Sequence, residues 1–149
     1  MKLHSKILAT FFGIGYFPLA PGTITSAIIV LLYKFWLHKI IWPVYLLLVI
    51  FLFIVGIFVS GVYSRESKKR DPRPVVIDEA AGQFLALFLV SPHWFPLGLS
   101  FFFFRLFDIT KPFFIKKVED FPGGLGIMLD DILAAAYAGI LTHLYLLLK

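Results

Sequence analysis

Residues 123–131 read G-G-L-G-I-M-L-D-D, and the apolar segment 132–148 follows them directly. The stretch therefore joins a glycine-rich turn and two adjacent carboxylates to a segment long enough to cross most of a bilayer. Charge that is removed from water must be paired or bound to a cation, so Asp130 and Asp131 need a partner beside hydrocarbon. We expect this partner to be a metal ion, with the rest of the chain supplying its other ligands.

The composition is that of an integral membrane protein. Of the 149 residues, 60% are hydrophobic and 18 are Phe, and the mean hydropathy is +0.90. Soluble domains are usually about 45–50% apolar. The length allows one domain, which we assign to residues 1–149. The absence of Cys excludes disulfides, thiol nucleophiles and thiolate metal sites.

The apolar segments predict an all-α fold. Residues 44–63 form the clearest membrane span, because they are apolar and carry no charge. Residues 75–90 are assigned to a helix, since an open strand in lipid would leave its backbone groups unsatisfied. We expect a compact multi-helix integral membrane bundle of about four to five apolar helices. The remaining helices are predicted at 24–42, 97–109 and 132–148, and a re-entrant or surface N-terminal segment at 7–21.

The basic residues predict the orientation in the membrane. Five of the fourteen Lys and Arg residues lie in 65–73, immediately after an apolar run, and the net charge is +5. Such a cluster favours the cytoplasmic side and anionic lipid headgroups. The basic residues are not interleaved as in a nucleic-acid groove, so no nucleic-acid partner is expected. With this loop inside, every acidic residue falls at a cytoplasmic helix end or in an inner loop.

The acidic residues predict a site for a hard cation. Asp78-Glu79 and Asp130-Asp131 are each expected to open a helix. A single pair at such a position could serve only to stabilise the helix N-terminus, through an interaction with the helix dipole worth about 0.3–1 kcal/mol. Two pairs together with Asp108 would repel one another strongly without a cation. Oxygen ligands in this number suit Mg²⁺, Mn²⁺ or Ca²⁺ better than zinc. The predicted metal-binding and catalytic residues are Asp78, Glu79, Asp108, Asp130 and Asp131.

A second set of residues predicts an anion site. Arg105 and Asp108 are spaced i,i+3 and could simply pair with each other. The alternative gives Asp108 to the metal, and Arg105 and Lys111 to a phosphate. Further candidates for phosphate contact are the glycines with free backbone N–H groups and the hydroxyls after the first turn, of which Thr23 is also a candidate N-cap. These candidates are Gly124, Gly126, Thr23 and Ser26.

Four blocks of the sequence resemble the phosphatidylglycerophosphatase A family in order and spacing, and the resemblance covers nearly the whole chain. The blocks are P-L-A-P-G-T-I-T-S (18–26), D-P-R-P-V-V-I-D-E-A-A-G (71–82), F-R-L-F-D-I-T-K-P (104–112) and G-G-L-G-I-M-L-D-D-I-L-A (123–134). Thr25 departs from the glycine usual in the family. The resemblance implies an all-helical, Mg²⁺-dependent enzyme that removes the terminal phosphate of phosphatidylglycerophosphate. It also implies that the enzyme acts at the inner face of the bacterial inner membrane.

Two chemical routes and one competing class of function follow from these residues. The carboxylates would either position an attacking water with the metal, or one of them would attack phosphorus and form an aspartyl-phosphate. The competing class is a small membrane cation transporter or channel subunit with an acidic ion path. That class predicts acids spread through the membrane depth, or two matching halves. The acids here are gathered toward one face and the halves share no pattern, which favours the phosphatase.

Overall fold

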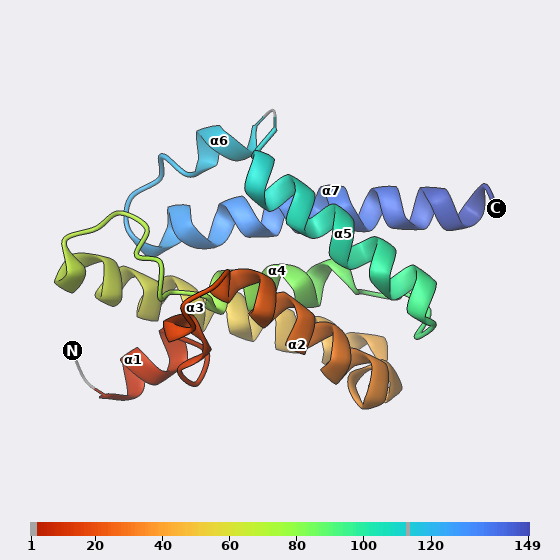
Figure 1. Cartoon of the computed structure of the whole chain (residues 1–149), viewed down its shortest axis with the longest axis horizontal. Helices are drawn as coiled ribbons and strands as arrows, with labels where there is room; N and C mark the ends of the chain where they lie inside the picture. The colour runs from red at the N-terminus through yellow and green to blue at the C-terminus, as the bar shows by residue number, and fades with distance from the viewer. Residues whose placement is uncertain (1–2, 113) are drawn as a thin grey trace.

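The computed structural model describes residues 3–112 and 114–149, which contain helices and no strands (Figure 1). The predicted all-α fold is therefore confirmed for this part of the chain. The helices are α1 (Leu3–Ala9), η1 (Ile14–Tyr16), α2 (Pro21–Phe35), η2 (Leu37–Lys39), α3 (Trp42–Ser67), α4 (Ile77–Ala86), α5 (Trp94–Thr110), α6 (Ile115–Val118) and α7 (Gly124–Leu147).

The short helix α4 lies at the centre and packs against α2, α3, α5 and α7 (Figure 1). Small residues make this possible, because Ala80 and Ala81 are fully buried and take little room between the helices. At Gly82, an added Cβ would collide with the Phe104 ring and lie 3.1 Å from the backbone oxygen of Asp131. The close contact fixes the first turn of α4, with its two acids, beside α7.

The two longest helices, α3 and α7, are long and apolar enough to cross a membrane. Their 26 and 24 residues correspond to lengths of about 39 and 36 Å, against a hydrocarbon core of about 30 Å. Large apolar side chains on α3, such as Phe51, Ile54 and Phe58, are exposed, as expected for a surface that faces lipid. The other helices are shorter, so the number of four to five crossing helices stays a prediction.

Several helix boundaries differ from the sequence-based expectation, and two of them concern the helices that carry the acids. Helix α7 begins at Gly124 rather than at residue 132, so Asp130 and Asp131 lie in its second turn and do not open it. Gly123 ends the preceding loop at a φ of 67°, a value that favours glycine. Gly124 and Gly126 lie within the first turn of α7, where neighbouring backbone leaves no room for a side chain. Helix α4 ends at Ala86 rather than at residue 90.

The predicted N-cap role of Thr23 is wrong. Helix α2 begins at Pro21, and the residue before it, Ala20, is its N-cap, with a φ of 44°. Proline is well suited to the first helical position, because its fixed φ is helical and its missing N–H is not needed there. The expectation for α4 is confirmed, since Asp78 and Glu79 both lie in its first turn.

Candidate active site

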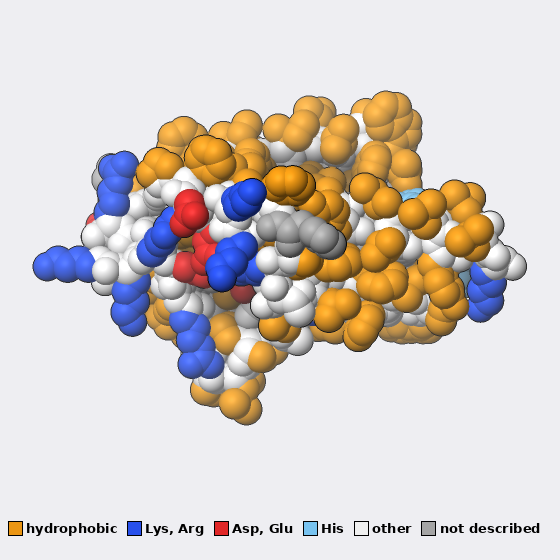
Figure 2. Space-filling model, turned by 90° about the horizontal axis from the view of Figure 1, so that it is seen from above, with side chains coloured by type: hydrophobic (Ala, Val, Ile, Leu, Met, Phe, Trp, Pro, Cys, Tyr) orange, Lys and Arg blue, Asp and Glu red, His pale blue; other side chains and the backbone are white. Residues whose placement is uncertain are grey.

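A polar pocket of about 210 Å³ lies where the beginning of α2, the loop before α4, the first turn of α4, the end of α5 and the beginning of α7 meet. Figure 2 shows acidic side chains recessed among Lys and Arg side chains, with hydrophobic side chains over much of the remaining face. The pocket thus gathers residues from four distant sequence segments. It is lined by Ala20, Pro21, Gly22, Asp71, Arg73, Val75, Asp78, Glu79, Arg105, Asp108, Lys111, Asp130 and Asp131.

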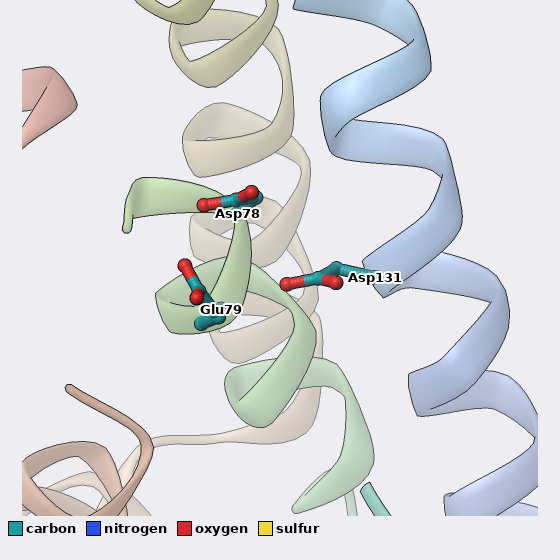
Figure 3. A group of neighbouring side chains, drawn as sticks. All are labelled: Asp78, Glu79 and Asp131. Carbon is teal, nitrogen blue, oxygen red and sulfur yellow. The ribbon is translucent and has the colours of Figure 1, made fainter. Parts of the chain in front are cut away.

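Three carboxylates form the inner cluster of this pocket. Asp78 and Glu79 come from α4, and Asp131 points toward them from α7 (Figure 3). Each offers a ligand oxygen, and these oxygens all lie within 4.8 Å of one another. Asp78 and Asp131 are buried, with exposures of 7% and 2%. Adjacent helices therefore bring the three acids to one point.

The inner cluster fits a divalent cation. Asp78 Oδ1, Glu79 Oε2 and Asp131 Oδ2 are buried and have no hydrogen-bond partner among the described residues. Burial, followed by the charges of Glu79 and Asp131, raises the pKa of Asp78 well above its usual range. Burial also raises the pKa of Glu79 to about 7. A bound cation would stabilise the ionised carboxylates and so oppose the rise in their pKa values. Hard carboxylate oxygens are the ligands that Mg²⁺ and Mn²⁺ prefer.

The other two predicted acids are each paired with a cation. Lys111 Nζ donates to Asp130 Oδ2 at 2.6 Å and lies 3.4 Å from Glu119 Oε1. Arg105 Nη1 lies 2.5 Å from Asp108 Oδ2. The i,i+3 pairing that the sequence left open is therefore present. The structure brings Asp108 and Asp130 to the pocket beside the cluster of three, and their role as metal ligands stays a prediction.

The two paired cations keep donors available for an anion. Arg105 Nε is buried and has no hydrogen-bond partner among the described residues. Lys111 has an ammonium group with three donors, and the structure places it at the left-handed C-cap of α5, with a φ of 43°. Burial by itself lowers the pKa of Lys111, but the hydrogen bond and charge of Asp130 outweigh this and raise it, so Lys111 stays cationic. Both groups can therefore contact phosphate oxygens.

Four residues that the sequence suggested for phosphate contact do not line this pocket, namely Thr23, Ser26, Gly124 and Gly126. Ser26 is fully buried on α2, and Thr23 is half-buried near it. A Cβ on Gly124 would collide with the backbone of Ile57 and Gly61 on α3, and one on Gly126 with the backbone of the loop before α7. The glycines thus serve close packing in this structure, and phosphate contact by these four residues stays a prediction.

The pocket also contains residues that were not among the predicted site residues. Gly22 touches the cluster, because a Cβ there would overlap Oε1 and Cδ of Glu79. Asp71 and Arg73 belong to the same sequence block as Asp78 and Glu79, and this shared block was the indication that could have identified them. Arg73 Nη2 donates to the backbone oxygen of Pro18 at 2.5 Å, which ties the loop before α4 to the loop before α2.

The chain is similar to known proteins over most of its length. The model of a family described as Phosphatidylglycerophosphatase A matches residues 7–146. A Bacteroides thetaiotaomicron protein, provisionally named as a phosphatidylinositol-3-phosphatase, is 36% identical in an alignment that covers 91% of this chain and 89% of that protein.

Two further relatives bear the family's own name. Proteins named Phosphatidylglycerophosphatase A from Haemophilus influenzae and Escherichia coli are 34% and 32% identical, each over 91% of this chain and over 85% and 80% of their own lengths. No solved structure matches the chain.

Proposed function

Because the chain belongs to the phosphatidylglycerophosphatase A family, we propose that it hydrolyses the terminal phosphate monoester of phosphatidylglycerophosphate, giving phosphatidylglycerol and inorganic phosphate. The proposal rests on one observation: a single pocket holds three carboxylates with unpartnered oxygens and two cationic side chains, Arg105 and Lys111. Family membership supports the hydrolase over the competing interpretation as a cation transporter or channel. The Mg²⁺ requirement is part of the proposal.

The chain's own residues divide the work in the following way. Asp78, Glu79 and Asp131 would hold Mg²⁺, which when bound neutralises phosphate oxygens and favours ionisation of a coordinated water. Arg105 donates from Nε, and Lys111 from its ammonium group, to the oxygens of the terminal phosphate. Asp108 and Asp130 hold these two cations in place through their ion pairs. Donors fixed in this way stabilise the charge that develops in the transition state.

Two routes for breaking the ester bond fit this pocket. In the first, a carboxylate accepts the proton of a water whose oxygen attacks phosphorus, and the P–O bond to the glycerol oxygen breaks as that oxygen takes up a proton. In the second, a carboxylate oxygen attacks phosphorus and forms an acyl phosphate, which water then hydrolyses. Trapping with hydroxylamine during turnover separates the routes, because only an acyl phosphate yields a hydroxamate on the protein.

The position of the pocket supports a place at the cytoplasmic face of the bacterial inner membrane, in a multi-pass protein. The pocket is lined by residues of the loop that follows α3 and by Asp130 and Asp131 of α7, which lie nearer the beginning of α7 than its end, so it is placed toward the same end of both candidate membrane helices. The basic residues 65–73 lie between the end of α3 and the start of α4, and such clusters favour the cytoplasmic side. Asp131 lies about 10 Å along α7 from its start, which suits a lipid headgroup entering from the membrane surface. Anionic lipids would gather at the same basic residues.

Phosphate release by the purified protein in detergent tests the proposal. The protein should release phosphate from phosphatidylglycerophosphate when Mg²⁺ is present, and excess EDTA should abolish the release until Mg²⁺ is restored. Phosphatidylinositol 3-phosphate should be assayed as a second substrate, because the Bacteroides relative is named for its hydrolysis. Absence of release from phosphatidylglycerophosphate would refute the substrate, and release that persists in EDTA would refute the metal requirement.

Replacing Gly22 by alanine should reduce turnover while leaving the fold intact. The added Cβ would overlap the Glu79 carboxylate, which is the end of a flexible side chain and can move away. Displacing one member of a cation site by even a fraction of an ångström should cost about ten- to a hundredfold in metal affinity or activity. The measurement is phosphate release as a function of Mg²⁺ concentration, together with the thermal unfolding temperature. Full activity at the same Mg²⁺ concentration would contradict the placement of Glu79.

A further inference from the structure

Arg73 differs from the other two cations of the pocket in having no acidic partner. Arg105 is paired with Asp108, and Lys111 with Asp130 and Glu119. Among the described residues no ion pair involves Arg73, which instead donates a hydrogen bond to the backbone oxygen of Pro18. A guanidinium has five N–H donors, so most of those on Arg73 remain available. Among the described residues of the pocket, Arg73 is therefore the cation that makes no direct ion pair.

The burial of the three cations gives the pocket an inner and an outer part. The Arg105 side chain is 14% exposed and that of Lys111 is 24% exposed, and both contact acids next to the inner cluster. Arg73 is exposed and lines the same pocket from the loop before α4. Figure 2 shows Lys and Arg side chains around the recessed acids. Arg73 thus shares the pocket with the inner cluster but occupies a more exposed position than Arg105 and Lys111.

The substrates named for the relatives share one chemical feature beyond the terminal phosphate. In phosphatidylglycerophosphate a three-carbon bridge joins the phosphate monoester to the phosphodiester that holds the lipid. In phosphatidylinositol 3-phosphate three ring carbons separate the same two groups. Both molecules therefore present a second, singly charged phosphate at a similar reach from the first, although glycerol and inositol differ in shape.

From these observations we infer that Arg73 binds the phosphodiester of the substrate, so that the site recognises a phosphate monoester and a phosphodiester separated by three carbons. The guanidinium is suited to this task because its fork of N–H donors matches two phosphate oxygens. The hydrogen bond to Pro18 uses an N–H of Nη2 and leaves the other N–H donors available. Arg73 is then a specificity-determining residue, and the inference rests on the proposed function.

The test compares two lipids in the unmodified protein and in Arg73→Gln. Glutamine keeps an N–H donor for the Pro18 oxygen but loses the charge and the fork. The variant should raise KM for phosphatidylglycerophosphate by about ten- to a hundredfold with a much smaller change in kcat, because a charged hydrogen bond to the non-reacting part of the substrate is lost. Phosphatidic acid has a phosphate monoester but no phosphodiester, so its kinetic constants should not change.

Arg70→Gln is the matched control. Arg70 lies in the same loop but does not line the pocket, and it pairs with Asp120 at an exposed site. Its replacement should leave the ratio of the two KM values unchanged, because any effect on the gathering of anionic lipids acts on both lipids alike. Arg73→Lys, which restores the charge without the fork, should recover part of the loss. If the unmodified protein does not hydrolyse phosphatidic acid at all, the rise in KM for phosphatidylglycerophosphate and its partial rescue by lysine decide the matter.

The outcomes that overturn the inference are distinct from those that overturn the proposed function. An equal loss on both lipids in Arg73→Gln would mean that Arg73 acts on the shared phosphate or on the fold, and an unchanged KM for phosphatidylglycerophosphate would mean that it binds no substrate. Either result would refute the inference while the hydrolase stands. Failure of the unmodified protein to hydrolyse phosphatidylglycerophosphate would refute the proposed function itself.

Discussion

Replacing Asp131 by asparagine should lower the kcat for phosphatidylglycerophosphate by on the order of a hundred- to a thousandfold. The change removes one charge and one ligand oxygen from the cluster with Asp78 and Glu79, and it keeps the size of the side chain. The fold should survive, because Asp131 Oδ2 makes no hydrogen bond to the described residues that asparagine would break. Phosphate release in detergent measures the first effect, and thermal unfolding without metal measures the second.

Asp120→Asn is the control for this change, since it removes an acid of the same type outside the pocket. Asp120 is exposed and pairs with Arg70 at 3.0 Å, an arrangement worth no more than about 1 kcal/mol. Its replacement should leave kcat and the unfolding temperature nearly unchanged. Normal turnover in Asp131→Asn would contradict the assignment of the inner cluster.

Replacing Gly124 by leucine should prevent the native packing of α3 against α7. The first atom of any side chain at this position would collide with the backbone of Ile57 and Gly61, and backbone in the middle of a helix cannot move aside. Overpacking of a close helix contact usually costs about 1–3 kcal/mol, and a whole leucine against backbone should exceed that range. The expected result is loss of the monodisperse folded species in size-exclusion chromatography and of a cooperative unfolding transition.

Gly139→Ala on the same helix provides the comparison. There the added Cβ would meet only the backbone oxygen of Ala86, at an ordinary distance of 3.9 Å. Alanine should therefore be tolerated, and its better helix propensity should stabilise α7 by about 0.5–1 kcal/mol. If Gly124→Leu and Gly139→Ala unfolded at the same temperature, the close contact between α3 and α7 would be wrong.

The sequence predicted the helical fold because a long apolar segment in lipid must satisfy its own backbone N–H and C=O groups, and a helix does so with hydrogen bonds inside the segment. It also indicated that acids from separate segments would meet, since those segments could be aligned at one membrane face from the basic residues 65–73. The structure brings Asp78, Glu79, Asp108, Asp130 and Asp131 to one pocket, as this alignment requires. The chemical roles of these residues remain predictions that the variants above test.

The division of labour among the acids was not visible in the sequence. Asp130 and Asp131 are neighbours in the chain, but successive residues on a helix point about 100° apart. Asp131 therefore faces the acids of α4, whereas Asp130 accepts from Lys111. This outcome depends on the rotation of α7 about its axis, which is set by where the helix begins and how it packs. The sequence-based start at residue 132 gave no means of fixing that rotation.

The roles of the glycines were hidden for a similar reason. Glycine at 124 and 126 suggested a loop that approaches an anion, because the sequence pattern of a loop and that of a closely packed helix start are alike. The space of the missing side chain is occupied by α3, which is distant in sequence, at Gly124. At Gly126 it is occupied by the backbone of the loop before α7. Only the tertiary arrangement identifies them.

Binding of Mn²⁺, followed by electron paramagnetic resonance in detergent, tests the central claim most directly, because it observes the cation at the site without depending on any substrate. Mn²⁺ accepts the same hard oxygen ligands as Mg²⁺. The unmodified protein should bind Mn²⁺ in competition with Mg²⁺, Asp131→Asn should bind it at least about tenfold more weakly, and Asp120→Asn should bind it normally. Equal Mn²⁺ affinity in the unmodified protein and Asp131→Asn would contradict a cation site formed by Asp78, Glu79 and Asp131.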